Sequence, residues 1–305
     1  MRAWKITVLA GLVLATGGAH GGDPSHLAAG LERALRSPDA DALPAVGQVL
    51  GPAAIEEAIA SPARRTVLAA ALAAPGAERP WPLLEPLAGS AAGPDRPIAV
   101  AAADAARAIS RRLDRQTVID EDVPDDVVRT ALAAWRAVGA DPRRWADVRV
   151  AALETGRSLH DALGEDAEPD DLAYDLTAAL RDSDPEIRRA ALELIAPDEL
   201  PLPIVAATLN DIDPIVALVA AQVLCAGLAF DEPAAPILAA AGATGLTRIR
   251  ALVRLPDQPP AAVLDAARCL ARDPSAESAA TMAHLAARGP RAIRAELRAL
   301  ARPLR

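Results

Sequence analysis

The phrase Leu-x-Asp-x-Asp-Pro occurs at 180–185 and again 29 residues later at 209–214, and this repetition constrains the fold more than any other feature of the chain. An Asp carboxylate accepts a hydrogen bond from a free amide in the first turn of a helix. Pro fits the first helical position because its fixed φ is already helical. Each phrase therefore predicts a helix start, and self-similarity at this period predicts stacked supersecondary units. The signature residues are Asp184, Pro185, Arg188, Asp213 and Pro214.

Helical periodicity follows the first phrase. After Pro185 the apolar residues recur at spacings of three and four, which places them on one face of a helix. The chain contains 27 prolines, many of them where a new helix would begin, so we interpret them as boundaries between helices. Only 2% of the residues are aromatic, and abundant Ala and Leu suit close, regular helix packing. We therefore predict an all-α fold, an α-α superhelix of stacked antiparallel helix pairs over 20–305.

The residues at 180–191 resemble the HEAT repeat, including its bacterial variant first named for phycobilisome lyases. The resemblance implies a right-handed α-solenoid of the HEAT and armadillo kind. It also implies a structural role for Arg188, which would bridge to a carboxylate of the adjacent turn such as Asp213. Second helices line the inner surface in this family, so exposed positions on them are candidate partner-binding residues. These are Arg189, Glu193, Arg250 and Arg254.

HEAT-like arrays are mostly scaffolds, so the resemblance implies a non-catalytic protein-interaction scaffold. Two alternatives stay open: a lyase-like or cofactor-handling protein, and an envelope-anchored structural module. Ser158, His160 and Asp161 are too close in sequence to converge, because neighbours in a helix point in different directions. The four histidines also lack metal-ligand spacing, except for His20 and His26 near the expected mature terminus. We expect no catalytic residues, no metal, no cofactor, and a monomer that binds a protein partner.

The N-terminus reads as a secretory signal peptide at 1–19. Arg2 and Lys5 precede an apolar run at 6–15, and small residues follow up to Ala19. The apolar run is about half the length that a membrane-spanning helix needs. We expect cleavage and export to the periplasm or the extracellular space. An uncleaved anchor and a first buried helix are the alternatives.

Charge limits the class of partner. The formal net charge is −9, and an acidic chain is a poor nucleic-acid binder because phosphate neutralisation needs clustered positive charge. The C-terminus is nevertheless basic, and arginines from 291 to 302 step by three and four residues, which predicts one helix face. This face is either a polar cap on the last repeat or a docking surface for an acidic partner or an anionic membrane. The arginines of this region are Arg288, Arg291, Arg294, Arg298, Arg302 and Arg305.

The chain contains two cysteines. Cys225 and Cys269 lie in Ala- and Leu-rich helices, so we expect two buried thiols, with a disulfide as the alternative.

Two segments, 120–126 and 161–171, are rich in acidic residues. They lack the ligand order of a calcium loop and indicate solvated loops and helix N-termini; a contact with calcium or a basic partner is the alternative. The stretch at 114–126 lacks clear periodicity and is a candidate hinge between two halves.

Overall fold

The structure is a computed structural model that describes residues 24–35, 43–164, 176–195, 202–226, 234–256 and 258–302. Helices are the only regular secondary structure within these residues, which confirms the all-α prediction. The chain divides into two compact units, Met1–Pro169 and Asp170–Arg305. The predicted signal peptide at 1–19 and the acidic residues at 165–171 lie outside the described residues.

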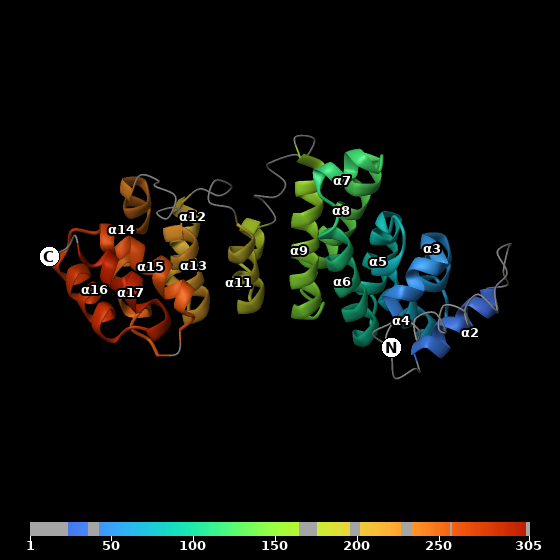
Figure 1. Ribbon diagram of the computed structural model, residues 1–305, viewed down its shortest axis with the longest axis horizontal. Coiled ribbons are helices and arrows are strands. Elements are labelled where there is room, and N and C mark those ends of the chain that lie inside the picture. The colour runs from blue at the N-terminus through green and yellow to red at the C-terminus, as the bar shows by residue number, and fades with distance from the viewer. Residues whose placement is uncertain are drawn as a thin grey trace. The chain divides into compact units, whose positions relative to one another are not determined.

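The first unit is a stack of helix pairs, seen side by side in Figure 1. Its helices are α2 (Pro24–Leu35), α3 (Leu43–Ile59), α4 (Arg64–Ala73), η2 (Ala74–Gly76), η3 (Trp81–Leu83), α5 (Leu84–Ala91), α6 (Arg96–Ser110), α7 (Arg115–Asp120), α8 (Asp125–Ala140) and α9 (Ala146–Leu163). The pairs are α3 with α4, α5 with α6, and α8 with α9. The pairs stack in two layers, because α4, α6 and α9 pack in succession, as do α3, α5 and α8. This is the arrangement of an α-solenoid.

Alanine dominates the interface between these layers. Helix α6 buries Ala99, Ala102 and Ala106 completely, and such small side chains let neighbouring helices approach closely. The largest side chain in this core is Trp135 of α8, which is 0% exposed. Its indole Nε1–H donates to the carbonyl oxygen of Leu84 at 2.9 Å, so the one polar atom of the ring is satisfied.

The second unit continues the helical pattern. Its helices are α11 (Pro185–Leu194), α12 (Leu202–Ala207), η5 (Thr208–Asn210), α13 (Pro214–Ala226), α14 (Ala234–Leu252), α15 (Pro260–Arg272), α16 (Ala276–Arg288), η7 (Arg291–Ile293) and α17 (Arg294–Leu300). Helices α11, α13, α15 and α17 pack in succession, and α12 packs on α14. Helix α14 kinks at Gly242, where φ is 62°, a conformation that glycine adopts without a side-chain penalty.

The two Asp-Pro phrases fold into equivalent turns. Asp184 caps α11 by accepting a hydrogen bond from the Glu186 amide at 2.8 Å, and Asp213 caps α13 through the Ile215 amide at 2.8 Å. The Asp two residues earlier accepts from the backbone amide of each capping Asp, at 2.9 Å in the first turn and 2.8 Å in the second. Each phrase therefore supplies a hydrogen-bond acceptor to a free backbone amide at the start of its own helix, as the sequence predicts.

Arg188 joins these two turns, but through Asp211 rather than the predicted Asp213. Its Nε and Nη2 donate to the two carboxylate oxygens of Asp211 at 2.7 and 2.8 Å, and its Nη1 donates to the carbonyl of Asp182 at 2.9 Å. The side chains of Arg188 and Asp211 are only 10% and 9% exposed. Asp213 is engaged elsewhere, because its carboxylate caps α13, and this explains the correction.

The same link recurs at the next Asp turn. Arg250 of α14 reaches Asp273 with Nη1 at 3.4 Å, and the two residues are separated by 23 positions, as are Arg188 and Asp211. Asp273 also accepts from the hydroxyls of Ser275 and Ser278 at 2.5 Å each. The second unit therefore contains two Arg-to-Asp links of equal sequence separation, a two-bond pair from α11 and a single longer contact from α14.

Cys225 and Cys269 form a disulfide, which corrects the expectation of two free thiols. The bond joins α13 to α15, and both sulfur-bearing residues are 0% exposed. Both residues are buried as predicted, but α13 and α15 pack directly against each other and bring the cysteines together. Sequence spacing alone did not establish that contact, because the two positions are 44 residues apart.

The candidate hinge at 114–126 lies inside the first unit, and the boundary between the compact units comes instead at 169/170. Val118 and Val123 belong to the buried core of the first unit. The Trp81 indole Nε1–H donates to the Glu121 carboxylate at 3.0 Å, and α7 packs on α9. Short helices with few apolar positions explain the weak periodicity of this stretch.

Candidate functional site

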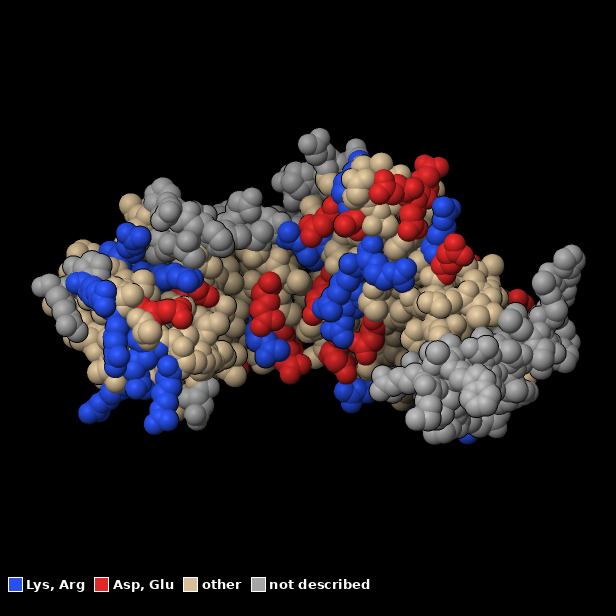
Figure 2. Space-filling model, viewed as in Figure 1, with Lys and Arg blue, Asp and Glu red and all other residues tan. Residues whose placement is uncertain are grey.

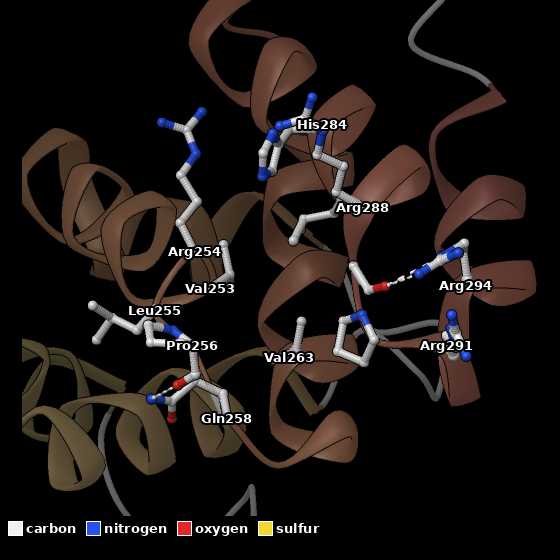
Figure 3. A pocket seen from close by; sticks show the side chains of 13 residues that line it. Val253, Arg254, Leu255, Pro256, Gln258, Val263, His284, Arg288, Arg291 and Arg294 are labelled. Carbon is white, nitrogen blue, oxygen red and sulfur yellow. Dashed lines mark hydrogen bonds between the residues drawn. The ribbon is translucent and has the colours of Figure 1, made fainter.

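The strongest candidate site is a pocket of about 460 Å³ in the second unit (Figure 3). It lies where the turn after α14 meets α16 and the start of η7 and α17. Val253, Leu255 and Pro256 of that turn form one wall, and Val263 of α15 and Leu285 of α16 contribute apolar surface. A pocket of this volume suits a small ligand or a short segment of a partner.

The chain folds into this shape because α16 ends abruptly at Gly289. The Gly289 amide donates to the Leu285 carbonyl at 2.8 Å and closes the last turn of the helix. A Cβ atom at Gly289 would lie 2.5 Å from the Leu285 oxygen and 2.8 Å from Leu297, so only glycine fits here. Pro290 then starts the 3-10 turn η7, which brings the chain back along the pocket rim.

Positive charge dominates the lining. Four arginines line the pocket together with His284 and Gln258, and none of the described lining residues is acidic. Figure 3 shows Arg254, His284 and Arg288 gathered on one side, with Arg291 and Arg294 on another. In Figure 2 arginine side chains also gather over the C-terminal helices of this unit. The pocket therefore presents cations from four segments: Arg254 follows α14, Arg288 ends α16, and Arg291 and Arg294 begin η7 and α17.

Two of these arginines are held in place by neutral partners. Arg254 Nη2 donates to the hydroxyl of Thr281 at 2.7 Å, and Thr281 is itself fully buried. Arg294 donates through Nε and Nη2 to the Gly289 carbonyl at 3.2 and 2.8 Å. Within the described part of the chain, the guanidinium groups of Arg288 and Arg291 form no hydrogen bond or ion pair. No carboxylate among the described residues neutralises the four arginines.

The predicted arginine face on one C-terminal helix is divided among three elements, which corrects that prediction. Arg288 lies in the last turn of α16, Arg291 lies in η7, and α17 begins only at Arg294. The break comes at Gly289 and Pro290, and Ile293 has φ −112° and ψ 6° rather than helical angles. Arg298 points back to the preceding helix, since its Nε donates to the Ala286 carbonyl at 3.3 Å.

The four predicted partner-binding residues have different surroundings. Arg189 and Glu193 form an exposed ion pair on α11 at 3.6 Å, and neither lines the pocket. Arg250 is tied to Asp273, Ser278 and Thr247 and is only 18% exposed, so it has a structural role like that of Arg188. Only Arg254 contributes to the pocket.

Electrostatics distinguish the structural arginines from those of the pocket. Hydrogen bonds from Arg188 hold the pKa of Asp211 below its ordinary value, although burial acts in the opposite direction. Burial also acts to raise the pKa of Asp273, but hydrogen bonds from Ser275 and Ser278 and the charge of Arg250 lower it overall. These carboxylates therefore stay ionised and neutralise their arginines, whereas no described carboxylate pairs with an arginine of the pocket.

The structure adds His284 and Gln258 to the residues that sequence reasoning had connected with binding. His284 lies one turn before Arg288 on α16, so its spacing from a flagged arginine was the available signal. Gln258 lies in a turn and had no comparable signal. The approach of Arg254 to Arg288 depends on how α14 and α16 end, which local spacing does not reveal.

Other sequence-derived candidates gain no new partners. Ser158 donates to the Glu154 carbonyl of its own helix at 3.2 Å, and His160 Nδ1 lies 3.9 Å from Asp161. Asp161 instead pairs with Arg157 at 3.0 Å. No group of three or more His, Cys, Asp or Glu among the described residues could hold a metal ion. In the same part of the chain, every helix is too short or too polar to cross a membrane.

Comparison with known protein-family models and with curated proteins gives no match to this chain.

Proposed function

We propose that this chain is an exported, HEAT-like helical scaffold that binds a protein partner and catalyses no reaction. The observation that carries the proposal is a pair of Arg-to-Asp links, Arg188 to Asp211 and Arg250 to Asp273, each spanning 23 residues. The shared separation, together with helices that pack in succession, supports a stack of similar helical units. Stacked helical repeats present long, continuous helix surfaces, which is the usual basis of their use as binding platforms.

Export is supported by the disulfide between Cys225 and Cys269. Structural disulfides persist in the periplasm and outside the cell and are rare in a reducing cytosol. A signal peptide at 1–19 would deliver the chain to such a compartment. The matching measurement is the intact mass of the protein recovered from the envelope and medium: loss of 1–19 supports cleavage, and its retention favours an anchored module.

The scaffold proposal is tested by cross-linking and affinity capture of the tagged full-length protein from its native host. We expect one stoichiometric protein partner, which should re-form a complex with the purified chain in size-exclusion chromatography with light scattering. The charge swap Arg189→Glu with Glu193→Arg tests the exposed surface of α11 while it keeps the net charge constant. Arg272→Glu is the control, because Arg272 is exposed on α15 and lies outside the pocket.

Two outcomes would contradict the scaffold. If the chain is folded and helical but captures no protein, the scaffold proposal is wrong. A chromophore or other small molecule that copurifies in stoichiometric amount would favour the cofactor-handling alternative.

A further inference from the structure

We propose that the pocket between the end of α14, α16 and η7–α17 binds a carboxylate-bearing, partly aliphatic segment of a protein partner. The inference rests on the proposed scaffold function and adds the place and chemistry of recognition. Its starting point is the charge imbalance of a concave site: Arg254, Arg288, Arg291 and Arg294 line it, and no described lining residue is acidic. A cleft lined by one sign of charge focuses its field and raises the local concentration of the opposite ion.

The guanidinium groups retain the donors that a carboxylate needs. Each guanidinium carries five N–H groups in a planar fork that matches a carboxylate in two parallel hydrogen bonds. The guanidinium groups of Arg288 and Arg291 form no hydrogen bond with any described residue, and both residues are exposed. Two forks of unused donors therefore lie at the pocket, at the end of α16 and in η7.

The other two arginines are already oriented before a ligand arrives. Thr281 holds Arg254 by one nitrogen, Nη2, and the Gly289 carbonyl holds Arg294 by Nε and Nη2. These acceptors are a hydroxyl and a carbonyl, so they fix the side chains without cancelling their charge. Fixing them in advance reduces the conformational entropy that binding would otherwise cost.

Apolar side chains beside the cations indicate what kind of anion fits. Leu255 is 41% exposed beside the arginines, whereas Val253 and Val263 of the same lining are already buried, at 4% and 1% exposed (Figure 3). A bare inorganic ion would leave the Leu255 side chain in water. A carboxylate next to methylene or aliphatic groups, as in a segment that alternates Glu and Leu, would cover it and gain from its burial.

The shape of the pocket and the total charge of the chain favour a short acidic protein segment over an anionic membrane or a nucleic acid. A membrane presents a broad surface, whereas these arginines line a hollow, and Leu255 is the one large, strongly exposed apolar residue among the described lining residues. A long nucleic acid would also meet the rest of a chain whose net charge is −9. A short acidic segment contacts only the cationic pocket.

The test is fluorescence anisotropy of the full-length protein with a fluorescein-labelled peptide of alternating Glu and Leu. The matched peptide contains Gln in place of Glu. We expect saturable binding of the acidic peptide alone, weakened by added NaCl because exposed charges are screened. The double variant Arg288→Glu with Arg291→Glu should lower affinity by at least about tenfold, since two charge-assisted contacts become repulsive.

A matched double variant separates pocket chemistry from overall charge. Arg181→Glu with Arg272→Glu changes the net charge equally, and both arginines are exposed and lie outside the pocket. It should bind the acidic peptide as the wild type does, and circular dichroism should show that both variants are folded. Equal losses in the two double variants, or binding of the Gln peptide, would overturn the proposal.

Two further arms identify the source of the anion and separate this inference from the scaffold itself. If phosphatidylglycerol vesicles bind through Arg288 and Arg291 while the peptide does not, the site is a membrane contact and the proposal is wrong. If the captured protein partner still binds the Arg288→Glu, Arg291→Glu variant, the scaffold stands and the pocket assignment fails. If the peptide binds as expected but no partner is captured, the pocket chemistry stands and the scaffold fails.

Discussion

Arg188 shows how one side chain can make two repeats into a unit. Its Nη1 donates to the carbonyls of Asp182 and Ser183 in the preceding turn, and its Nε and Nη2 donate to Asp211 of the next turn. Removal of one partner from a mostly buried pair leaves an uncompensated charge, which is why such pairs are sensitive to substitution even when their net contribution is modest. The neighbouring Arg189 differs, because its ion pair with Glu193 is exposed.

The first prediction compares these adjacent arginines. Arg188→Ala should lower the free energy of unfolding by about 2–4 kcal/mol, because Asp211 and two carbonyls lose a donor in a mostly buried setting. Arg189→Ala on the same helix should change it by less than about 1 kcal/mol, since exposed ion pairs contribute little. Urea unfolding followed by circular dichroism measures both. Similar losses in the two variants would show that the link from Arg188 to Asp211 has no special role.

The second prediction concerns pH. Arg188 holds the pKa of Asp211 below its ordinary value of 3.8. A carboxyl group with a depressed folded-state pKa stabilises the fold above its unfolded pKa, and that contribution is lost as the pH falls toward the folded value. Wild-type stability should therefore decline below about pH 4. In Arg188→Ala the decline over this range should be shallower, because the pKa of Asp211 is no longer depressed.

Thermal midpoints measured from pH 7 down to pH 2 test this in both proteins. Arg189→Ala serves as the control and should keep the wild-type pH profile, since it leaves Asp211 and its partner intact. Parallel profiles for the wild type and Arg188→Ala would argue that other carboxylates control acid unfolding.

At the scale of single helices, the Asp-Pro pattern in the sequence predicts the first residue of some helices but not of others. Helices α11 and α13 begin at Pro185 and Pro214, as the capped Asp-Pro phrase indicates. Helix α9 begins at Ala146, although the dipeptide Asp141-Pro142 stands four residues before it. There Asp141 binds the Arg143 amide and both following arginines, so it stabilises a turn rather than a helix start. A local signature cannot tell which of these two uses its carboxylate will serve.

The candidate site was only partly predictable for a related reason. Sequence spacing flagged Arg288, Arg291 and Arg294 as a cationic group, and the family resemblance flagged Arg254. Their convergence depends on two helix ends, α14 after Leu252 and α16 at Gly289, and on the turn that follows. Arg250 is less exposed than its position on the helix suggests in sequence, because it contacts the Asp273 turn, which comes 23 residues later.

The third prediction tests close packing between helices of the first unit. A Cβ atom at Gly47 of α3 would lie 2.0 Å from the Ala73 carbonyl oxygen, a backbone atom that cannot move aside cheaply. Gly47→Ala should therefore destabilise the protein by about 2 kcal/mol or more. Gly89→Ala in α5 is the control: no atom lies within 4 Å of its added Cβ, so it should stabilise by roughly 0.5–1 kcal/mol.

Chemical unfolding of the two glycine variants decides this prediction. A neutral or stabilising effect of Gly47→Ala would mean that α3 and α4 separate easily, and the close approach between them would not be a constraint on the fold.

At the scale of the whole molecule, the chain divides into two compact units, and each contains a cluster of buried apolar residues. One large core extends from Leu31 to Leu163 in the first unit, and Ala217, Leu218, Leu252 and Ala262 form a cluster in the second. In repeat proteins each repeat contacts only its neighbouring repeats, so a destabilising substitution acts first on the stack of helices that contains it. The disulfide lies entirely in the second unit and Gly47 in the first, so each reports on one unit.

The last prediction uses this separation. Differential scanning calorimetry of the full chain should show two transitions. Gly47→Ala should lower the midpoint of one by several degrees. Cys225→Ala with Cys269→Ala should lower the other, because opening a loop of 44 residues removes up to about 4 kcal/mol of stabilisation. Dithiothreitol should reproduce the second shift in the wild type and leave the cysteine-free variant unchanged. A single transition moved by both changes would instead mean that the two units unfold as one cooperative body.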